Sequence, residues 1–337
     1  MNRLASLTAY PWISNRIDSV TLNDMTIRQF SYDAAGNITS DARLGSVYEY
    51  DYNNAGQIRR VMFEGTRRAL YSYNGLRQLS SRTVENMGVD NGTTHFIHDL
   101  WGNVIAETDG TGAAGSTREY IWIPEAGYAG VSLPIATVEG VNTADSALYY
   151  THTDHLSRPV MMTDGVKAVV WQASWSPFGR PHTITGSLTE NRRFPGQWFQ
   201  LEAGIHYNWH RHYDPTIGRY TSPDPLGFVD GPSVYGYVNG NPIIYIDPDG
   251  RVSQYIGAAA IGARAVYRYC KRLLKDFLKD DSGAVHRTNR SKSNKPKHEK
   301  GNARRDRDRG GEKGDARRRN EGTNPNKRPK GHKGKWP

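Results

Sequence analysis

A short turn motif recurs along the chain and constrains what the sequence can fold into. Each copy has an aromatic residue or His, then Asp or Asn, and closes on Gly or an equivalent residue before an aliphatic one. The copies begin at Tyr32, Tyr50, Tyr71, His98 and His152. Asp and Asn hydrogen-bond their own backbone, and Gly supplies a positive φ without steric cost. Turns recurring at roughly 20-residue spacing predict a ribbon of β-hairpins.

The segments between these turns have the composition of β-strands. Residues 47–52, Val-Tyr-Glu-Tyr-Asp-Tyr, alternate in character along the chain. Tyr and β-branched residues suit a pleated, half-buried surface. We therefore predict a mainly β fold built from antiparallel hairpins.

The charge of the chain divides near residue 250. The net charge is +10, but residues 251–337 carry 26 Lys and Arg against 9 Asp and Glu, whereas residues 1–250 carry 18 against 25. This asymmetry predicts two parts, of which the basic one meets an anionic partner. The alternative is a solvated, disordered tail.

Composition excludes several classes of protein. The mean hydropathy is −0.72, and no apolar run reaches the length of about 18 residues that suggests a membrane helix. The first residues contain no apolar segment of signal-peptide length, so we expect export without a cleaved signal peptide. A single cysteine, Cys270, excludes an intrachain disulfide framework and a cysteine-clustered zinc site. No dinucleotide-binding or phosphate-loop signature is present, and no cofactor is predicted.

Two Asp-Pro-x-Gly units, at residues 224–227 and 247–250, precede the basic part. They are typical of tight turns, because Pro fixes φ and Gly takes the strained position. The same units also permit chemistry. Two neighbouring carboxylates do not both ionise readily, so one can act as a base and the other as an acid.

The ordered set of motifs resembles the Rhs family of bacterial YD-repeat proteins, over residues 30–250. The resemblance rests on Tyr-Thr-His-Thr-Asp-His-Leu-Ser-Arg-Pro at 150–159, Trp-Ser-Pro-Phe-Gly at 175–179, Phe-Pro-Gly-Gln at 194–197 and Tyr-Asn-Trp-His-Arg-His-Tyr-Asp at 207–214, followed by the two Asp-Pro-x-Gly units. The resemblance implies a curled, shell-like antiparallel sheet around a hollow interior. It also implies three parts: YD-repeat hairpins at 1–150, an Rhs-repeat-associated core at 151–250 and a variable effector at 251–337.

Too few turns precede the core to close a large shell. We expect either a truncated orphan module or a further YD-repeat chain that completes the shell. An incomplete sheet leaves edge strands open to association.

The resemblance also implies a reaction, since in many relatives the core cuts its own backbone just after the second Asp-Pro-x-Gly unit. It implies Asp224 as the catalytic aspartate, Asp247 as the aspartate at the cut site, and Gly250–Arg251 as the scissile bond. We expect Arg219 to hold a carboxylate or a carbonyl oxygen in place. Relatives usually carry Leu after the motif, so Arg251 departs from the pattern and puts the cut in question.

Three histidines, His206, His210 and His212, lie close together in the core. At strand spacing His210 and His212 share one face, which would suit a metal pair. The alternative, which we favour, is that these histidines occupy buried aromatic positions. No metal site is assigned.

The basic part begins with apolar residues at helical spacing, which predict a helix over residues 252–280. Beyond residue 287 the composition is polybasic and cannot form a core alone. Lys and Arg neutralise phosphates, and the predicted nucleic-acid-binding residues are Arg304, Arg305, Lys313, Arg317 and Arg318. His298 and Glu299 are the candidate acid and base of a nuclease. A metal-dependent nuclease would instead bind a divalent cation through Glu299, Asp306, Asp308, Glu312 or Asp315.

Together these features predict an Rhs-type polymorphic toxin that releases a basic effector, a nuclease used in competition between bacteria. The expected partners are an acidic immunity protein, a secretion-machine spike or adaptor, and nucleic acid as substrate. The effector would be delivered into a target cell. The alternative is a non-enzymatic adhesion protein at the cell surface, with a polybasic tail that binds nucleic acid or the cell wall.

Overall fold

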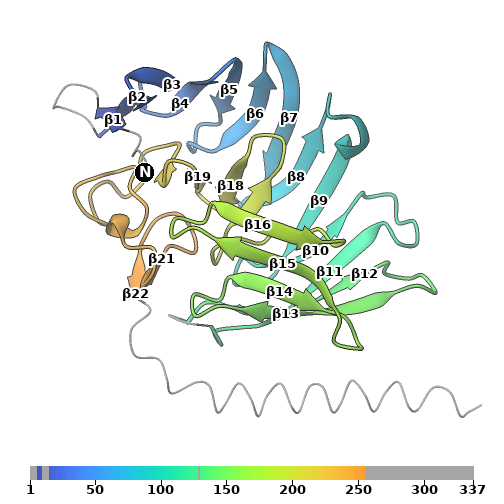
Figure 1. Ribbon diagram of the computed structural model, residues 1–337. Helices are drawn as coiled ribbons and strands as arrows, with labels where there is room; N and C mark the ends of the chain where they lie inside the picture. The colour runs from blue at the N-terminus through green and yellow to red at the C-terminus, as the bar shows by residue number, and fades with distance from the viewer. Residues whose placement is uncertain (1–5, 10–14, 128–129, 256–337) are drawn as a thin grey trace, which may run out of the picture. The chain divides into compact units, whose positions relative to one another are not determined.

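The computed structural model describes residues 6–9, 15–127 and 130–255 (Figure 1). These residues belong to one compact unit, Met1–Asp280. The segment predicted as a helix lies outside the described residues from position 256 onward, and Gln254–Tyr255, near its start, is a strand. Within the described part of the chain, no helix is long and apolar enough to cross a membrane.

Sixteen strands form one antiparallel sheet in which each strand pairs with its neighbours in the chain. They are β1 (Ser6–Ala9), β2 (Ile17–Leu22), β3 (Met25–Tyr32), β4 (Ile38–Arg43), β5 (Ser46–Tyr52), β6 (Ile58–Phe63), β7 (Thr66–Tyr73), β8 (Leu79–Val84), β9 (Gly92–His98), β10 (Val104–Thr108), β11 (Thr117–Ile123), β12 (Leu133–Glu139), β13 (Ala147–Thr153), β14 (Pro159–Thr163), β15 (Val169–Trp175) and β16 (Pro181–Gly186). The sheet curves strongly (Figure 1) but does not close, because β1 and β16 are its edges among the described strands. This confirms the predicted mainly β fold. The meander runs past residue 150, where the first boundary was expected.

The turn motif works as its residues predict. At the first copy, the Asp33 N–H donates to the Asn37 carbonyl oxygen (3.0 Å), and Asp33 Oδ1 accepts from the Asn37 N–H (2.8 Å). Gly36 between them has φ +93°. The same five-residue pattern recurs further along the chain. In each copy the N–H of the first residue donates to the carbonyl oxygen of the fifth, and the side-chain oxygen of the first accepts from the N–H of the fifth. The first residues of these copies are Asn53, Asn74, Asp99, Asp154 and Asp164.

A second antiparallel sheet, of four strands, packs against the large one. Its strands are β17 (Trp198–Gln200), β18 (Ile205–Asn208), β19 (Arg211–Asp214) and β20 (Arg219–Tyr220). Every residue of β18 and β19 is buried. One hydrophobic cluster joins Ile58 and Ala69 of the large sheet to Ala203 and Ile205 of the core region. The large sheet therefore forms the support on which β18 and β19 are fixed.

Buried polar contacts set how the two sheets meet. Arg28 of β3 pairs with both Asp41 of β4 and Asp214 of β19. The Gln57 Nε2 atom donates to the Trp209 carbonyl oxygen (2.7 Å). These buried ion pairs and hydrogen bonds form only in one geometry, so they fix the position of β19 relative to the hairpins.

A small hairpin follows the core. Its strands are β21 (Tyr245–Ile246) and β22 (Gln254–Tyr255), with Ile246 opposite Gln254. Two 3₁₀ turns are η1 (Gly88–Asp90) and η3 (Val238–Gly240). Ile246 is fully buried in a cluster with Tyr213, Tyr220 and Tyr237. The second Asp-Pro-x-Gly unit is therefore the tip of a hairpin whose base is anchored in the core.

Candidate self-cleavage site

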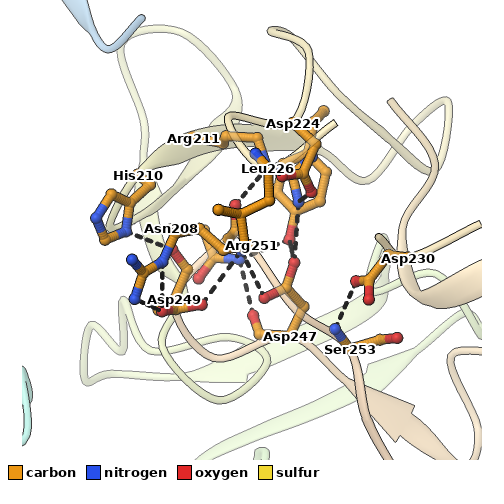
Figure 2. A network of polar contacts seen from close by, with 12 residues as sticks. Asn208, His210, Arg211, Asp224, Leu226, Asp230, Asp247, Asp249, Arg251 and Ser253 are labelled. Atoms are coloured by element: carbon orange, nitrogen blue, oxygen red, sulfur yellow. Dashed lines mark hydrogen bonds and ion pairs between the residues drawn. The ribbon is translucent and has the colours of Figure 1, made fainter. Parts of the chain in front are cut away.

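Arg211, the first residue of β19, stands at the centre of a buried polar network (Figure 2). Its Nη2 atom lies 2.8 Å from Asp224 Oδ2 and 3.1 Å from Asp247 Oδ2. Its guanidinium carbon lies 3.6 Å from the centre of the Tyr220 ring. All three charged side chains are at most 3% exposed. The structure thus brings the two predicted aspartates together on one guanidinium.

The peptide bond between Gly250 and Arg251 is held on both sides. Arg211 Nε donates to the Gly250 carbonyl oxygen, and the Arg251 N–H donates to Asp247 Oδ1 (2.9 Å). Gly250 has φ +74°, and a Cβ there would lie 2.5 Å from the Asn208 carbonyl oxygen. Only glycine fits this position without movement of the backbone.

The first Asp-Pro-x-Gly unit is a tight turn that aims a carboxylate at this site. The Gly227 N–H donates to the Asp224 carbonyl oxygen (3.0 Å), and Asp224 Oδ1 accepts from the Leu226 N–H (2.8 Å). These bonds leave Asp224 Oδ2 directed at Arg211. Residues 224–227 therefore form a tight turn and also place a carboxylate at the candidate site.

Two neutral side chains position Asp247. The Tyr220 hydroxyl donates to Asp247 Oδ2 (2.7 Å), and Asn208 Nδ2 donates to the Asp247 carbonyl oxygen (2.9 Å). Burial raises the pKa of the Asp247 carboxyl, and the Arg211 charge opposes this rise. The same two causes act on Asp224, whose pKa is also raised. A raised pKa favours the protonated carboxyl, which is the form that can act as an acid.

Access to the site is unequal. An open cavity of about 540 Å³ is lined by Asp224 and its neighbours Pro223 and Pro225, together with the turns that follow β3 and β5. Asp247 does not line this cavity and is 1% exposed. The cavity therefore opens beside Asp224 and not beside Asp247.

The Arg251 side chain folds back onto the hairpin. Its Nε and Nη2 atoms donate to Asp249 Oδ2 at 2.8 and 2.6 Å, and the side chain is 41% exposed. The Asp249 carbonyl oxygen in turn lies 3.0 Å from His210 Nδ1. The polar residue that replaces the usual Leu is thus accommodated at the surface by Asp249.

Arg219 lies elsewhere. Its guanidinium donates to the Asn15 carbonyl oxygen and stacks over Tyr235 at 5.6 Å. Arg219 was expected to hold a carboxylate or a carbonyl oxygen at the site, and the carbonyl oxygen that it holds is that of Asn15. The contacts to Asp224, Asp247 and the Gly250 carbonyl oxygen are made by Arg211. One feature of the sequence could have pointed to Arg211. It is a charged residue between two histidines, in a segment of alternating aromatic residues.

Comparisons with known proteins relate the chain to bacterial toxins. No family model matches the chain. It is 28% identical to "Double-stranded DNA deaminase toxin A" of Burkholderia cenocepacia, over 78% of this chain and 22% of that protein. It is also 28% identical to "Toxin protein Tse5" of Pseudomonas aeruginosa, over 75% and 21%. With "Probable deoxyribonuclease RhsA" of Dickeya dadantii it shares 27% identity, over 66% and 15%. The chain is a homologue of Rhs-type polymorphic toxins. It spans about a fifth of the length of the first two relatives.

The rings of His206 and His212 in this Rhs homologue are fully buried. His206 Nδ1 lies 2.8 Å from Gln197 Oε1, and the His212 ring stacks 6.1 Å from that of Tyr71. Burial lowers the pKa of His212 to about 3. Among the described residues, no group of three or more His, Cys, Asp or Glu is placed to hold a metal. The predicted tail residues lie outside the described part of this Rhs-type chain: His298, Glu299, Arg304, Arg305, Lys313, Arg317 and Arg318.

Proposed function

We propose that this chain is the self-cleaving carrier portion of an Rhs-type toxin and that it cuts its backbone between Gly250 and Arg251. One observation carries the proposal. A buried network of one arginine and two aspartates contacts both the carbonyl oxygen and the amide nitrogen of that bond. A tight turn needs no such convergence of charge on its peptide bond.

We propose a role for each group from its position. Asp224, beside the open cavity, takes a proton from a water that attacks the Gly250 carbonyl carbon. Arg211 stabilises the negative charge that develops on the carbonyl oxygen. A new C–O bond forms, the C–N bond breaks, and its electron pair passes to the Arg251 nitrogen. In the intact chain Asp247 Oδ1 accepts a hydrogen bond from the Arg251 N–H. Protonated Asp247 supplies the proton that the leaving amine needs.

The released part, residues 251–337, is proposed to act on nucleic acid in a competing bacterium. Its excess of Lys and Arg and the nucleic-acid activities in the names of the relatives support this. His298 and Glu299 would be its acid and base, and Arg304, Arg305, Lys313, Arg317 and Arg318 its phosphate contacts. A divalent metal on its acidic residues remains the alternative chemistry. Residues 1–150 and 151–250 would be the hairpin and core parts of the carrier, with a further YD-repeat chain completing the shell.

Such a toxin requires partners. An acidic immunity protein would neutralise the basic effector in the producing cell, and a secretion spike or adaptor would carry the toxin out. The similarity to a protein named as a toxin supports this proposal.

Intact-mass measurement of the purified full-length chain tests the cut. We expect two species that separate between Gly250 and Arg251 in the wild type and one uncut species in Asp224→Asn. Asp164→Asn is the matched control, because Asn serves equally well at the equivalent turn positions Asn53 and Asn74. Undiminished cutting in Asp224→Asn would refute the assignment. One uncut wild-type species would favour the adhesion protein with a polybasic tail.

A further inference from the structure

A cavity of about 210 Å³ lies beside the β21–β22 hairpin. Its walls come from the turns after β9 and β13, from β11, from residues 192–198 and from Pro248 and Gln254 of the hairpin. Its surface is mainly apolar, and Trp101 in its lining is 50% exposed, so part of the lining faces solvent. A cavity of about 150 Å³ admits benzene, so this one has room for a branched aliphatic side chain.

The described part of the chain ends at this cavity. Gln254 lines it, and Tyr255 is the last described residue. Strand β22 is held in place by its pairing with β21 and by the Ser253 N–H, which donates to Asp230 Oδ2. An extended residue spans at most about 3.6 Å, so the Cα atom of Ile256 lies within about 7 Å of that of Gln254. The Ile256 side chain is therefore within reach of the cavity.

The residues that follow β22 differ from the rest of the basic part. Residues 256–263, Ile-Gly-Ala-Ala-Ala-Ile-Gly-Ala, carry no charged or polar side chain, and the first charge after Arg251 is that of Arg264. Residues 251–337 hold 26 Lys and Arg, none of which falls in this stretch. Apolar side chains gain free energy by leaving water, and Gly lets a backbone approach a neighbouring surface closely. The composition of residues 256–263 therefore suits contact with an apolar wall.

We propose that this cavity is the docking site of residues 256–263, with the Ile256 side chain inside it and the residues that follow lying over Trp101. Three observations favour this occupant: the described chain ends at the cavity, the cavity surface is mainly apolar, and its volume admits an aliphatic side chain. The basic part would then begin as an uncharged segment packed on the carrier, and its charged residues would start at Arg264.

Thiol reactivity in the full-length chain tests the docking. Ile256→Cys is combined with Cys270→Ser, so that it carries the only thiol. Cysteine behaves as a small hydrophobe and should still enter the cavity. We expect this thiol to react with a maleimide at least 10-fold more slowly than the thiol of Val229→Cys in the same background, because Val229 is 65% exposed and does not line the cavity. Equal rates would overturn the proposal.

A further substitution locates the docked segment. Trp101→Ala should speed the reaction of the Ile256→Cys thiol several-fold, because it removes the half-exposed aromatic wall. Val166→Ala should leave the rate unchanged. It is the matched control because Val166 and Trp101 occupy the third position of equivalent turns, where their N–H donates to the aspartate that opens the turn (3.0 and 2.9 Å), and Val166 does not line the cavity. Circular dichroism checks that each variant is folded.

Two other results would also overturn the proposal. A slow reaction that Trp101→Ala does not change would place residues 256–263 against another surface. A protection that disappears on dilution would assign the cavity to a second copy of the chain. Intact-mass measurement of the same samples reports separately whether the backbone is cut, so a failure of the docking and a failure of the proposed cut are told apart.

Discussion

At the scale of single residues, the proposed cut depends most on Arg211. Its guanidinium reaches Asp224, Asp247 and the Gly250 oxygen at once, and a lysine ammonium cannot reproduce that fork. We expect Arg211→Lys to slow cutting by about 100-fold or more, the usual cost of losing an oxyanion donor. The measurement is the fraction of cut chain over time during cell-free translation. Arg219→Lys should cut normally, because Arg219 contacts Asn15 instead. Equal effects of both substitutions would contradict the assignment.

A second residue-scale prediction concerns His212, which is buried and neutral. Its pKa falls from 6.5 to about 3 on folding. A lowered pKa stabilises the folded state above pH 6.5, and this contribution is lost as the pH falls toward 3, because the unfolded chain takes up the proton first. His212→Leu should flatten the pH dependence of the unfolding free energy in this window, by up to about 1.4 kcal/mol per pH unit. Denaturant titrations at several pH values measure it. An unchanged slope would mean that the His212 imidazole binds its proton equally well in the folded and the unfolded chain.

At the scale of elements, the tip of the β21–β22 hairpin sets the geometry of the scissile bond. Gly250→Ala introduces a Cβ 2.5 Å from the Asn208 carbonyl oxygen at a φ of +74°, which must shift the bond away from Arg211. We expect cutting to fall about 10-fold or more, since small misplacements of reacting groups are costly. Gly227→Ala is a close control. It has a φ of +75° but nothing within 4 Å of the new Cβ, so it shares the strain without the clash. Similar loss in both variants, measured by the same time course, would remove the steric explanation.

The elements also differ in how far the sequence predicts them. The hairpins were predictable because one five-residue segment, such as Asp33 to Asn37, contains every donor and acceptor of its turn. Asp224 and Asp247 were predictable from their motif. Arg211 was not, because 36 residues separate it from Asp247 and only the packing of β19 brings them together.

At the scale of the whole described unit, the large sheet and the proposed cleavage site are linked through Arg28. This buried guanidinium on β3 holds Asp41 and Asp214, and Asp214 ends the strand that Arg211 begins. Arg28→Ala would leave two buried carboxylates without their shared partner. Breaking such a pair costs about 3–5 kcal/mol, which thermal or denaturant unfolding would measure. Arg60→Ala removes the exposed pair with Asp51 and should cost at most about 1 kcal/mol.

The same substitution tests whether cutting waits for the hairpins to fold. If the large sheet positions β19, Arg28→Ala should slow cutting under conditions where the chain remains folded, because the Arg211 guanidinium is then less firmly placed. Arg60→Ala should cut at the wild-type rate. A chain that is destabilised by Arg28→Ala yet cuts normally would mean that β17–β20 and the hairpin form the site by themselves. Slowed cutting would instead mean that the effector stays attached until the sheet around the core is complete, so that release is tied to folding of the carrier.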